Sequence, residues 1–269
     1  MDTLTTLISI FTKHRALLWQ FALRTVELRH KGSHLGLIWS FLSPLIMLAL
    51  YVLVFGYIFG GSFGVIKGEG PVDYGLGIFL GLAIFNFASD LLSNTAAIIL
   101  ENTNLVKKVV FPLEVLPAAN VLAALIHLSI TLVLVFTGLA LFGRWPGASA
   151  LLLPVVVLPL FMGGLGIAWM MSALGVFLRD IRQILPAMST GLMFASAVFY
   201  SAAKIPPAAW AFLKFNPVVH AVLNARAVVL WGHPLDPFGI IYLYITGTLM
   251  MFIGLWTFNR LRPSFADVM

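Results

Sequence analysis

Six long apolar windows constrain the fold of this chain more than any other feature of its sequence. A helix needs roughly 20 apolar residues to cross the hydrocarbon core of a bilayer, and each window has about that length. The windows therefore predict six transmembrane helices packed as one domain. They cover residues 36–60, 75–98, 115–142, 151–178, 184–202 and 238–259.

The composition supports an all-α integral membrane protein. Hydrophobic residues make up 61% of the chain and charged residues 10%, whereas soluble domains carry about 25% charge. The mean hydropathy is +1.02. We expect a single transmembrane domain over residues 1–269, with an interfacial segment at 1–34, the helical bundle at 35–260 and a cytoplasmic tail at 261–269. The absence of cysteine excludes disulfides, thiol nucleophiles and thiolate metal sites.

The distribution of Lys and Arg predicts the orientation. If the amino terminus lies inside, eleven of the sixteen basic residues fall in cytoplasmic segments, as the positive-inside rule requires. Both termini are then cytoplasmic, and the opening 31 residues lack a secretory signal pattern, so we expect them to be retained. We interpret the net charge of +6 as a signal of membrane topology and as a source of attraction to anionic lipid. The sequence has no basic domain that would bind nucleic acid.

A basic amphipathic stretch near residues 12–31 precedes the first window and predicts an interfacial helix. At helical spacing its apolar side chains can shelter in the membrane interface while its basic side chains remain near water and lipid phosphate. The apolar set is Leu17, Leu18, Phe21, Val26 and Leu28, and the basic set is Arg15, Arg24, Arg29 and Lys31.

The external connection at 201–237 is long and apolar, and several prolines interrupt it. Prolines divide such a segment into short helices. We expect a re-entrant hairpin that dips into the outer leaflet between spans five and six. A surface-packed extracellular cap is the alternative.

Two predicted cytoplasmic connections carry a further signal. The stretch at 101–112 is polar, then basic and apolar, and ends at Pro112, which suits a short helix docked in a groove of another protein. The second connection contains FLRDI at 177–181. Ordinary positive-inside loops explain the charges of both equally well.

Four strings, in this order and spacing, resemble the transmembrane subunit of type-2 ABC exporters. They are RHKGSHLGLIW at 29–39 with Pro44, NLVKKVVFP at 104–112, FLRDI at 177–181, and Asn216-Pro217 followed by Arg226. The resemblance is to the branch that exports lipid-linked polysaccharide such as O-antigen, capsule or teichoic acid. One departure is SAVFY at 196–200, which lacks the proline that often follows the serine in relatives, so the resemblance does not place the break near the end of span five.

The resemblance implies a homodimer with two nucleotide-binding subunits in the bacterial inner membrane. This chain has no phosphate-binding Gly-x-x-x-x-Gly-Lys-Ser/Thr motif, so ATP and Mg would be used by the partner, and the chain itself would have no catalytic residue, metal or cofactor. The helix near 12–31 and the loop after span two would contact the ATPase, and the hairpin would form an external gate. The coupling residues are Asn102, Asn104, Leu105, Lys107 and Lys108, and the gate residues are Trp210, Phe215, Asn216 and Pro217.

The implied cargo is a glycan on a polyprenyl pyrophosphate. Aromatic rings suit a sliding glycan because sugar C–H faces stack on them without directional hydrogen bonds, although aromatic residues in membrane helices more often face lipid or pack. Arg24, Arg29 and Lys31 are candidate contacts for the pyrophosphate, or simply topology and lipid anchors. The pathway candidates are Tyr51, Phe55, Phe59, Phe85, Phe87, Phe194, Phe199 and Tyr200.

Asp90 is the acid placed well inside a predicted span, near Asn86, Ser89, Ser93 and Asn94. An intramembrane carboxylate is costly, so a proton-coupled secondary transporter is one alternative function. No basic partner lies within an adjacent turn, and we favour a packed or cavity-facing polar cluster.

An integral membrane transferase acting on polyprenyl-phosphate sugars is the other alternative. Glu69 and Asp73 would be its carboxylates, and His30 with His34 has the spacing of a helical metal pair. We favour structural roles for all four.

Small residues in the windows predict close helix packing, because no hydrophobic effect drives helices together in lipid. The signals are Gly56-x-x-x-Gly60, Gly77-x-x-x-Gly81 and the cluster Gly163, Gly164 and Gly166.

Overall fold

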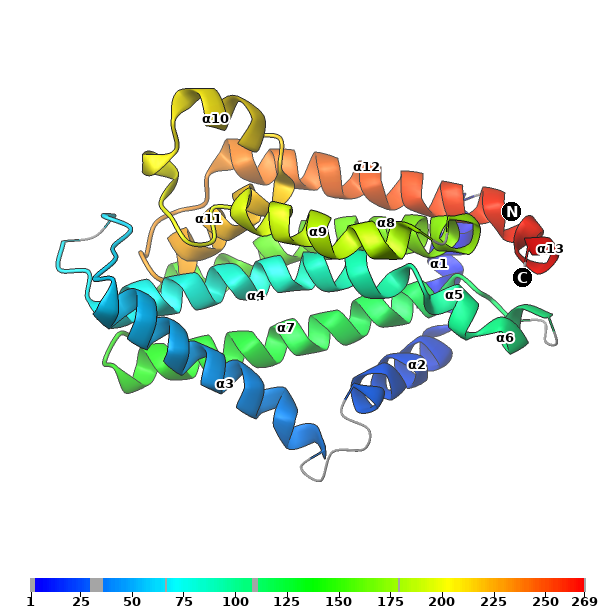
Figure 1. Ribbon diagram of the computed structural model, residues 1–269, viewed down its shortest axis with the longest axis horizontal. Helices are drawn as coiled ribbons and strands as arrows, with labels where there is room; N and C mark the ends of the chain where they lie inside the picture. The colour runs from blue at the N-terminus through cyan, green and yellow to red at the C-terminus, as the bar shows by residue number, and fades with distance from the viewer. Residues whose placement is uncertain (1–2, 30–35, 66, 108–110, 179, 269) are drawn as a thin grey trace.

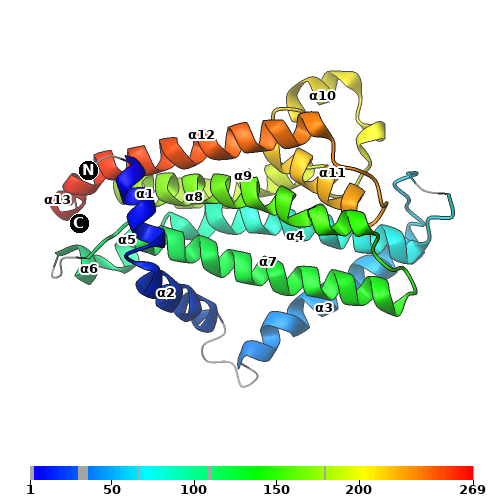
Figure 2. The same cartoon turned by 180° about the vertical axis from the view of Figure 1, so that it is seen from behind.

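The structure, a computed structural model, describes residues 3–29, 36–65, 67–107, 111–178 and 180–268. Within these residues every regular element is helical. The long helices α4, α7, α8 and α12 run along the long axis of the molecule, and the two ends of the chain lie at the same end of the bundle (Figures 1 and 2). We call this the termini end, and the end that carries α10 and α11 the hairpin end.

Five segments of the described chain are long and apolar enough to cross a membrane, and they match five of the six predicted windows. In three of them shorter helices directly precede or follow the main one. The five are α3 (Trp39–Tyr51) continued by the π-helix η2 (Val52–Ile58), α4 (Pro71–Thr95), α7 (Val115–Leu141), η3 (Ala148–Leu152) continued by α8 (Leu153–Phe177), and α12 (Pro237–Leu261), followed by η5 (Arg262–Ser264) and α13 (Phe265–Val268).

The predicted window at 184–202 differs from the structure. Its helix, α9 (Ile181–Phe194), has only 14 residues, and the chain then leaves helical conformation, with Ala197 at a φ of 52°. A positive φ is unfavourable for alanine. The cause lies in side chains from α4 and α11 that hold the following backbone, as described below.

The proline-rich connection is divided into short helices, as predicted. These are η4 (Ala202–Lys204), α10 (Pro207–Leu213) and α11 (Pro217–Val229), and proline stands in the first turn of α10, α11 and α12. Proline suits this position because its missing N–H has no partner there in any helix.

The amino-terminal segment forms two helices where we expected one. These are α1 (Thr3–Phe11) and α2 (Arg15–Leu28), which packs against α7. Leu18 and Ala22 are buried together with Ile10 in the protein core, so Leu18 does not face the membrane interface as predicted. Leu28 is 48% exposed, which agrees with an interfacial position.

The connection after α4 contains two short helices, α5 (Ile98–Glu101) and α6 (Thr103–Lys107). The expectation of a short helix in this loop is therefore confirmed. Lys31, Lys108, Arg179, His30 and His34 lie outside the described residues.

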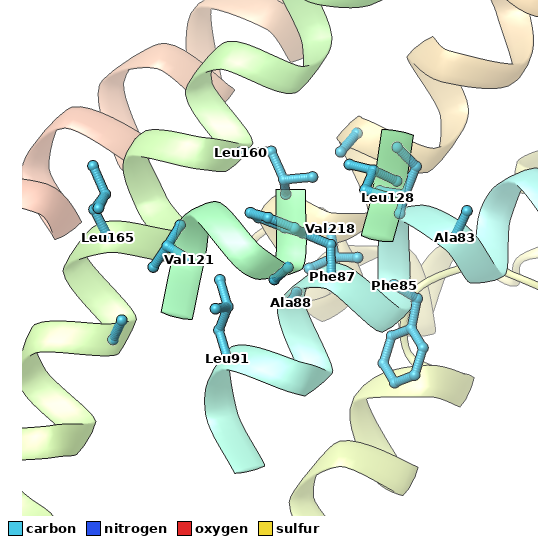
Figure 3. Packing of buried hydrophobic residues seen from close by; sticks show 14 of the residues in the cluster. Ala83, Phe85, Phe87, Ala88, Leu91, Val121, Leu128, Leu160, Leu165 and Val218 are labelled. Atoms are coloured by element: carbon cyan, nitrogen blue, oxygen red, sulfur yellow. The ribbon is translucent and has the colours of Figure 1, made fainter. Parts of the chain in front are cut away.

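Helix α4 is the centre of the bundle. Within its most apolar 18 residues 78% are buried, against 17% for α3 and η2, so α3 and η2 leave most of their surface uncovered. Figure 3 shows side chains of α4, α7, α8 and α11 meeting in the core, among them Phe87, Leu128, Leu160 and Val218.

Glycines let the helices approach closely, as predicted. A Cβ atom on Gly166 would overlap the backbone of Met250, and one on Gly254 would overlap the carbonyl of Gly166, so α8 and α12 touch backbone to backbone. Gly56 lies in the same way against Pro71. Gly60 is different, because it has a φ of 57° and open space around it, which is a turn position.

Candidate functional site

A polar cavity of about 320 Å³ lies between α4 and α7, and Arg29 also lines it. The Arg29 guanidinium forms an ion pair with the Asp90 carboxylate, and the Asn94 amide donates to the other carboxylate oxygen. Our expectation that Asp90 lacks a basic partner holds only along the chain, because Arg29 comes from 61 residues away. Asn86, Ser89 and Ser93 also line the cavity, so Asp90 belongs to a cavity-facing polar cluster.

A second cavity, of about 370 Å³, lies between α2, α5 and α7. Arg29 and Asn94 line both cavities, which therefore adjoin. The second cavity adds Arg24, Thr25 and Asn120. We call the two together the entry cavity.

Asn120 carries an unsatisfied amide in the entry cavity. The residue is 4% exposed, and its Nδ2 has no hydrogen-bond partner among the described residues. An unpaired buried donor costs free energy, so this position favours a ligand that accepts a hydrogen bond. Sequence reasoning missed Asn120, although an asparagine inside an apolar window is the signal that would have found it.

Of the predicted pyrophosphate contacts, the structure brings Arg24 and Arg29 to the same cavity. Both side chains belong to exposed residues at the end of α2. Arginine binds phosphate through several fixed N–H donors. The arrangement can therefore hold an anionic group near the junction of α2, α4 and α7.

Five of the eight predicted pathway aromatics form one continuous row. Phe55 stacks on Phe199 with ring centroids 5.4 Å apart, and Phe199 lies 6.3 Å from Phe194. Tyr51 and Phe59 lie 5.9 and 5.7 Å from Phe55 on either side. The row thus joins α3 and η2 to α9.

The other three predicted aromatics lie outside this row. Phe85 and Phe87 are 4% and 3% exposed in the core of the bundle, where Figure 3 shows them, so within one chain they have almost no surface for a passing glycan. The Tyr200 hydroxyl donates to the carbonyl of Phe194 and closes the turn after α9.

Arg226 holds this turn. Its side chain is fully buried and donates to the carbonyls of Gly77, Ala197 and Val198, and its guanidinium lies 4.3 Å from the centre of the Phe63 ring. Backbone polar groups away from water need internal partners, so Arg226 explains why the chain can leave the helix here. The resemblance included this arginine, but its role required the fold.

Two more side chains complete the turn. The Tyr74 hydroxyl donates to the carbonyl of Phe199 at 2.8 Å, and the Asn216 amide donates to the carbonyl of Ala195 at 3.0 Å. Asn216 also caps α11 by accepting from Val218 N–H. Two predicted gate residues, Asn216 and Pro217, therefore lie at the start of α11, where Asn216 connects this helix to the turn after α9.

The remaining gate residues occupy α10 and its end. Trp210 is partly buried, and its ring centroid lies 6.3 Å from that of His220. Phe215 is 65% exposed, with the Lys214 ammonium 5.2 Å from its ring centre. The Tyr242 hydroxyl ties this segment to α12 by donating to the Phe215 carbonyl.

The described coupling residues lie at the termini end, on α6 and on the residue between α5 and α6 (Figure 1). Asn102 donates to the carbonyl of Ile98, and Asn104 is exposed. Leu105 faces a cavity of about 480 Å³ that Arg262 also lines. The set is Asn102, Asn104, Leu105 and Lys107, with Lys108 beyond the described residues.

Two contacts connect the coupling segment to other helices. Phe21 of α2 meets Phe111 edge to face, with ring centroids 5.4 Å apart. Arg262 forms an ion pair of 2.8 Å with Glu114 and donates to the carbonyl of Phe111. The segment after α6 thus contacts both α2 and the end of α12.

The two carboxylates proposed for an enzyme have structural partners. Glu69 accepts hydrogen bonds from Ser62 and from the backbone of Phe63 and Gly64. Asp73 caps the start of α4 and pairs with Arg144 at 3.0 Å. Both carboxylates therefore organise loops at the hairpin end, and the enzyme alternative is not favoured.

Comparisons with known proteins agree with this architecture. Residues 16–230 match the family described as ABC-2 type transporter. The O-antigen export system permease protein RfbA of Myxococcus xanthus is 29% identical over 259 residues, which cover 95% of this chain and 96% of that protein. The protein of the same name from Klebsiella pneumoniae is 26% identical, with coverages of 91% and 92%.

A transport protein for another polysaccharide is also similar. The polysialic acid transport protein KpsM of Escherichia coli is 26% identical over 238 residues, which cover 87% of this chain and 88% of that protein. Because the family match extends over more than half of the sequence, the chain belongs to the ABC-2 type transporter family, as a membrane-spanning permease subunit of a type-2 ABC transporter.

Proposed function

We propose that this chain is the permease of an ATP-driven exporter that moves lipid-linked polysaccharide, O-antigen above all, across the inner membrane. Capsule or teichoic acid are further cargo classes. The observation that carries the proposal is the entry cavity, where Arg24, Arg29 and the unpaired amide of Asn120 converge. The names of the similar permeases for O-antigen and polysialic acid support the cargo class.

The entry cavity suits an anionic lipid head group. The basic residues concentrate at the termini end, which supports a cytoplasmic position for it. Arg24 and Arg29 would bind the pyrophosphate of a polyprenyl-linked glycan, and Asn120 would donate to a phosphate oxygen. Asp90 holds Arg29 until the phosphate replaces the carboxylate.

The aromatic row supports a glycan path along α3, η2 and α9. Phe59 and Phe194 are 69% and 58% exposed, and they lie on helices that this chain leaves largely uncovered. A second copy facing these helices would enclose the row between two subunits. Stacking on ring faces would then guide the polymer without strong binding at any one step.

Coupling to two ATPase subunits would occur at the termini end. α6 exposes Asn104, while Leu105 packs inward, so the helix has one face for a partner and one anchored in this chain. The contact between Phe21 and Phe111 would transmit movement of α6 to α2. ATP and Mg would be bound by the partner.

The hairpin from α10 to α11 would act as the external gate. Its inner end is fixed by Asn216 and Arg226, whereas Phe215 and Phe212 are exposed at 65% and 80%. Apolar surface of this kind suits the outer leaflet, which supports the re-entrant arrangement over a cap in water.

Deleting the gene tests the proposal. We expect full-length polysaccharide on its lipid carrier to accumulate inside the cell and to disappear from the surface, with recovery on complementation. A transferase would instead leave the polymer shortened or absent. Normal surface polysaccharide in the deletion strain would overturn the proposal, and co-purification of a P-loop ATPase with the tagged chain would support it independently.

A further inference from the structure

A separate cavity of about 570 Å³ lies at the hairpin end, away from the entry cavity. Its walls come from α10, α11 and the connection from α11 to α12. Binding sites for small ligands usually have volumes of roughly 300–1,000 Å³, with aromatic walls and a few polar groups. The lining includes Trp210, Trp231, His220, His233, Asn224 and Asp236.

We infer that this cavity binds one pyranose unit of the exported glycan as it emerges, and the inference rests on the proposed function. Two tryptophans line one small cavity together with two histidines. Large aromatic faces beside neutral hydrogen-bonding groups suit a sugar, whose C–H faces stack on rings while its hydroxyls pair with polar atoms. We call it the hairpin-end cavity.

Hydrogen bonds hold the polar wall of the cavity in place. Asn224 accepts from Asp236 N–H at 2.8 Å and donates to the His220 carbonyl at 2.9 Å. His220 Nε2 lies 2.8 Å from the carbonyl of Lys214. Because a carbonyl only accepts, Nε2 is the donor, and this bond fixes the orientation of the His220 ring in the wall.

The aromatic wall keeps unused donors. The indole N–H groups of Trp210 and Trp231 donate no hydrogen bond to the part of the chain that the structure describes, and His233 is exposed. Trp231 is supported from behind by Phe63, with ring centroids 6.0 Å apart, and Phe63 in turn carries the guanidinium of Arg226. The stacking surface is thus attached to the rigid turn after α9.

The charge of the wall argues against a phospholipid head group. Among the described residues that line the cavity, none is Lys or Arg, and the carboxylate of Asp236 is occupied by the backbone N–H groups of Phe238 and Gly239. A phosphate would find no permanently charged cation among them. A neutral sugar has no such requirement.

The test measures glycan binding by the full chain in nanodiscs. The probe is free glycan released by mild acid from the surface polysaccharide of the source organism, followed by saturation-transfer NMR. We expect saturable binding by the wild type, and about tenfold weaker binding in Trp210→Ala and in Trp231→Ala, as for aromatic anchors in other sites. His233→Ala should weaken binding without touching the core.

Trp145→Ala is the matched control. Trp145 is 81% exposed in the loop after α7, at the same end of the bundle, and lies outside the cavity lining, so its loss should leave binding unchanged. No saturable binding by the wild type, or equal binding by all variants, would overturn the inference. The inference would also be overturned if the tryptophan variants bound glycan normally and changed only the retention of the protein in the membrane, because the tryptophans would then be membrane anchors.

The outcome is separable from the proposed function. If gene deletion traps the polymer inside the cell but the wild-type chain does not bind free glycan, the hairpin-end cavity is not a sugar site and the export function stands. If deletion leaves surface polysaccharide unchanged, the export function itself fails.

Discussion

Arg29 and Asp90 form an ion pair that ties the residue after α2 to the carboxyl-terminal part of α4. Their side chains are 28% and 20% exposed where they line the polar entry cavity. Under the proposed function, a phosphate that enters this cavity would replace the Asp90 carboxylate on Arg29. The ion pair would then hold Arg29 in position until the head group binds.

Arg29→Ala should reduce export of polysaccharide several-fold, whereas Asp90→Asn should retain it. The first variant removes a phosphate donor, and the second keeps a hydrogen-bonding side chain while freeing Arg29. Surface polysaccharide per unit of membrane-inserted protein measures both effects.

Arg144→Ala provides the control for these variants. Arg144 is also a partly exposed arginine paired with a carboxylate, Asp73, but at the hairpin end. Its loss should leave export near the wild-type level. Abolished export in Asp90→Asn would favour the proton-coupled alternative.

Arg226→Met should destabilise the protein by about 3 kcal/mol or more, since three buried carbonyls would lose their donor. Arg226→Lys should recover part of this loss of stability, because an ammonium still donates hydrogen bonds. Recovery should be incomplete, because an ammonium lacks the planar fork of a guanidinium. Thermal unfolding in detergent measures the change. Arg260→Met, at an exposed position of α12, should unfold as the wild type does. Unfolding of Arg226→Met at the wild-type temperature would contradict the role of Arg226 in holding the turn after α9.

Gly166→Ala should lower stability by about 1–3 kcal/mol, because the added methyl group meets the backbone of Met250, which cannot move aside. Gly191→Ala is the matched change, since nothing lies within 4 Å of its Cβ position. Alanine is favoured over glycine inside a helix by roughly 0.5–1 kcal/mol. The two variants should therefore shift Tm in opposite directions, and similar shifts would count against close packing of α8 on α12.

Combined replacement of Tyr51 and Phe55 by Ala should impair export while leaving insertion and assembly intact. Both rings belong to the continuous row that reaches Phe199. Tyr57→Ala is the control on the same segment, because Tyr57 is 63% exposed and lies outside the row. Normal export by the double variant, measured beside its amount in the membrane, would remove the row from the glycan path.

Contacts between residues far apart in the chain could not be predicted from the sequence. Length and apolarity located five spans, and the prolines of 201–237 predicted that this connection is divided into short helices, because these signals are local. The early end of α9 at Phe194 depends on Arg226 and Tyr74, which reach it from other helices. An apolar stretch of sequence does not show which side chains of other helices will bind its backbone.

In the candidate site, too, local signals were predictable and contacts between distant helices were not. The basic residues Arg24 and Arg29 could be proposed as phosphate contacts from their position before an apolar window, and that role stays a prediction. Asp90 and Asn120, which line the entry cavity with them, come from α4 and α7, so the cavity exists only in the folded chain. Phe85 and Phe87 were placed in the pathway because their residue type alone does not distinguish a core ring from a lining ring.

Photo-cross-linking from the entry cavity tests the central claim most directly. A benzophenone amino acid at position 25 would lie in the cavity lining, while one at position 27 would lie on the same helix at an exposed position outside it. In cells that make the polymer, we predict cross-links to lipid-linked polysaccharide from position 25 but few from position 27, and loss of the signal with Arg29→Ala. Equal cross-linking from both positions, or none from position 25, would contradict entry of the head group between α2, α4 and α7.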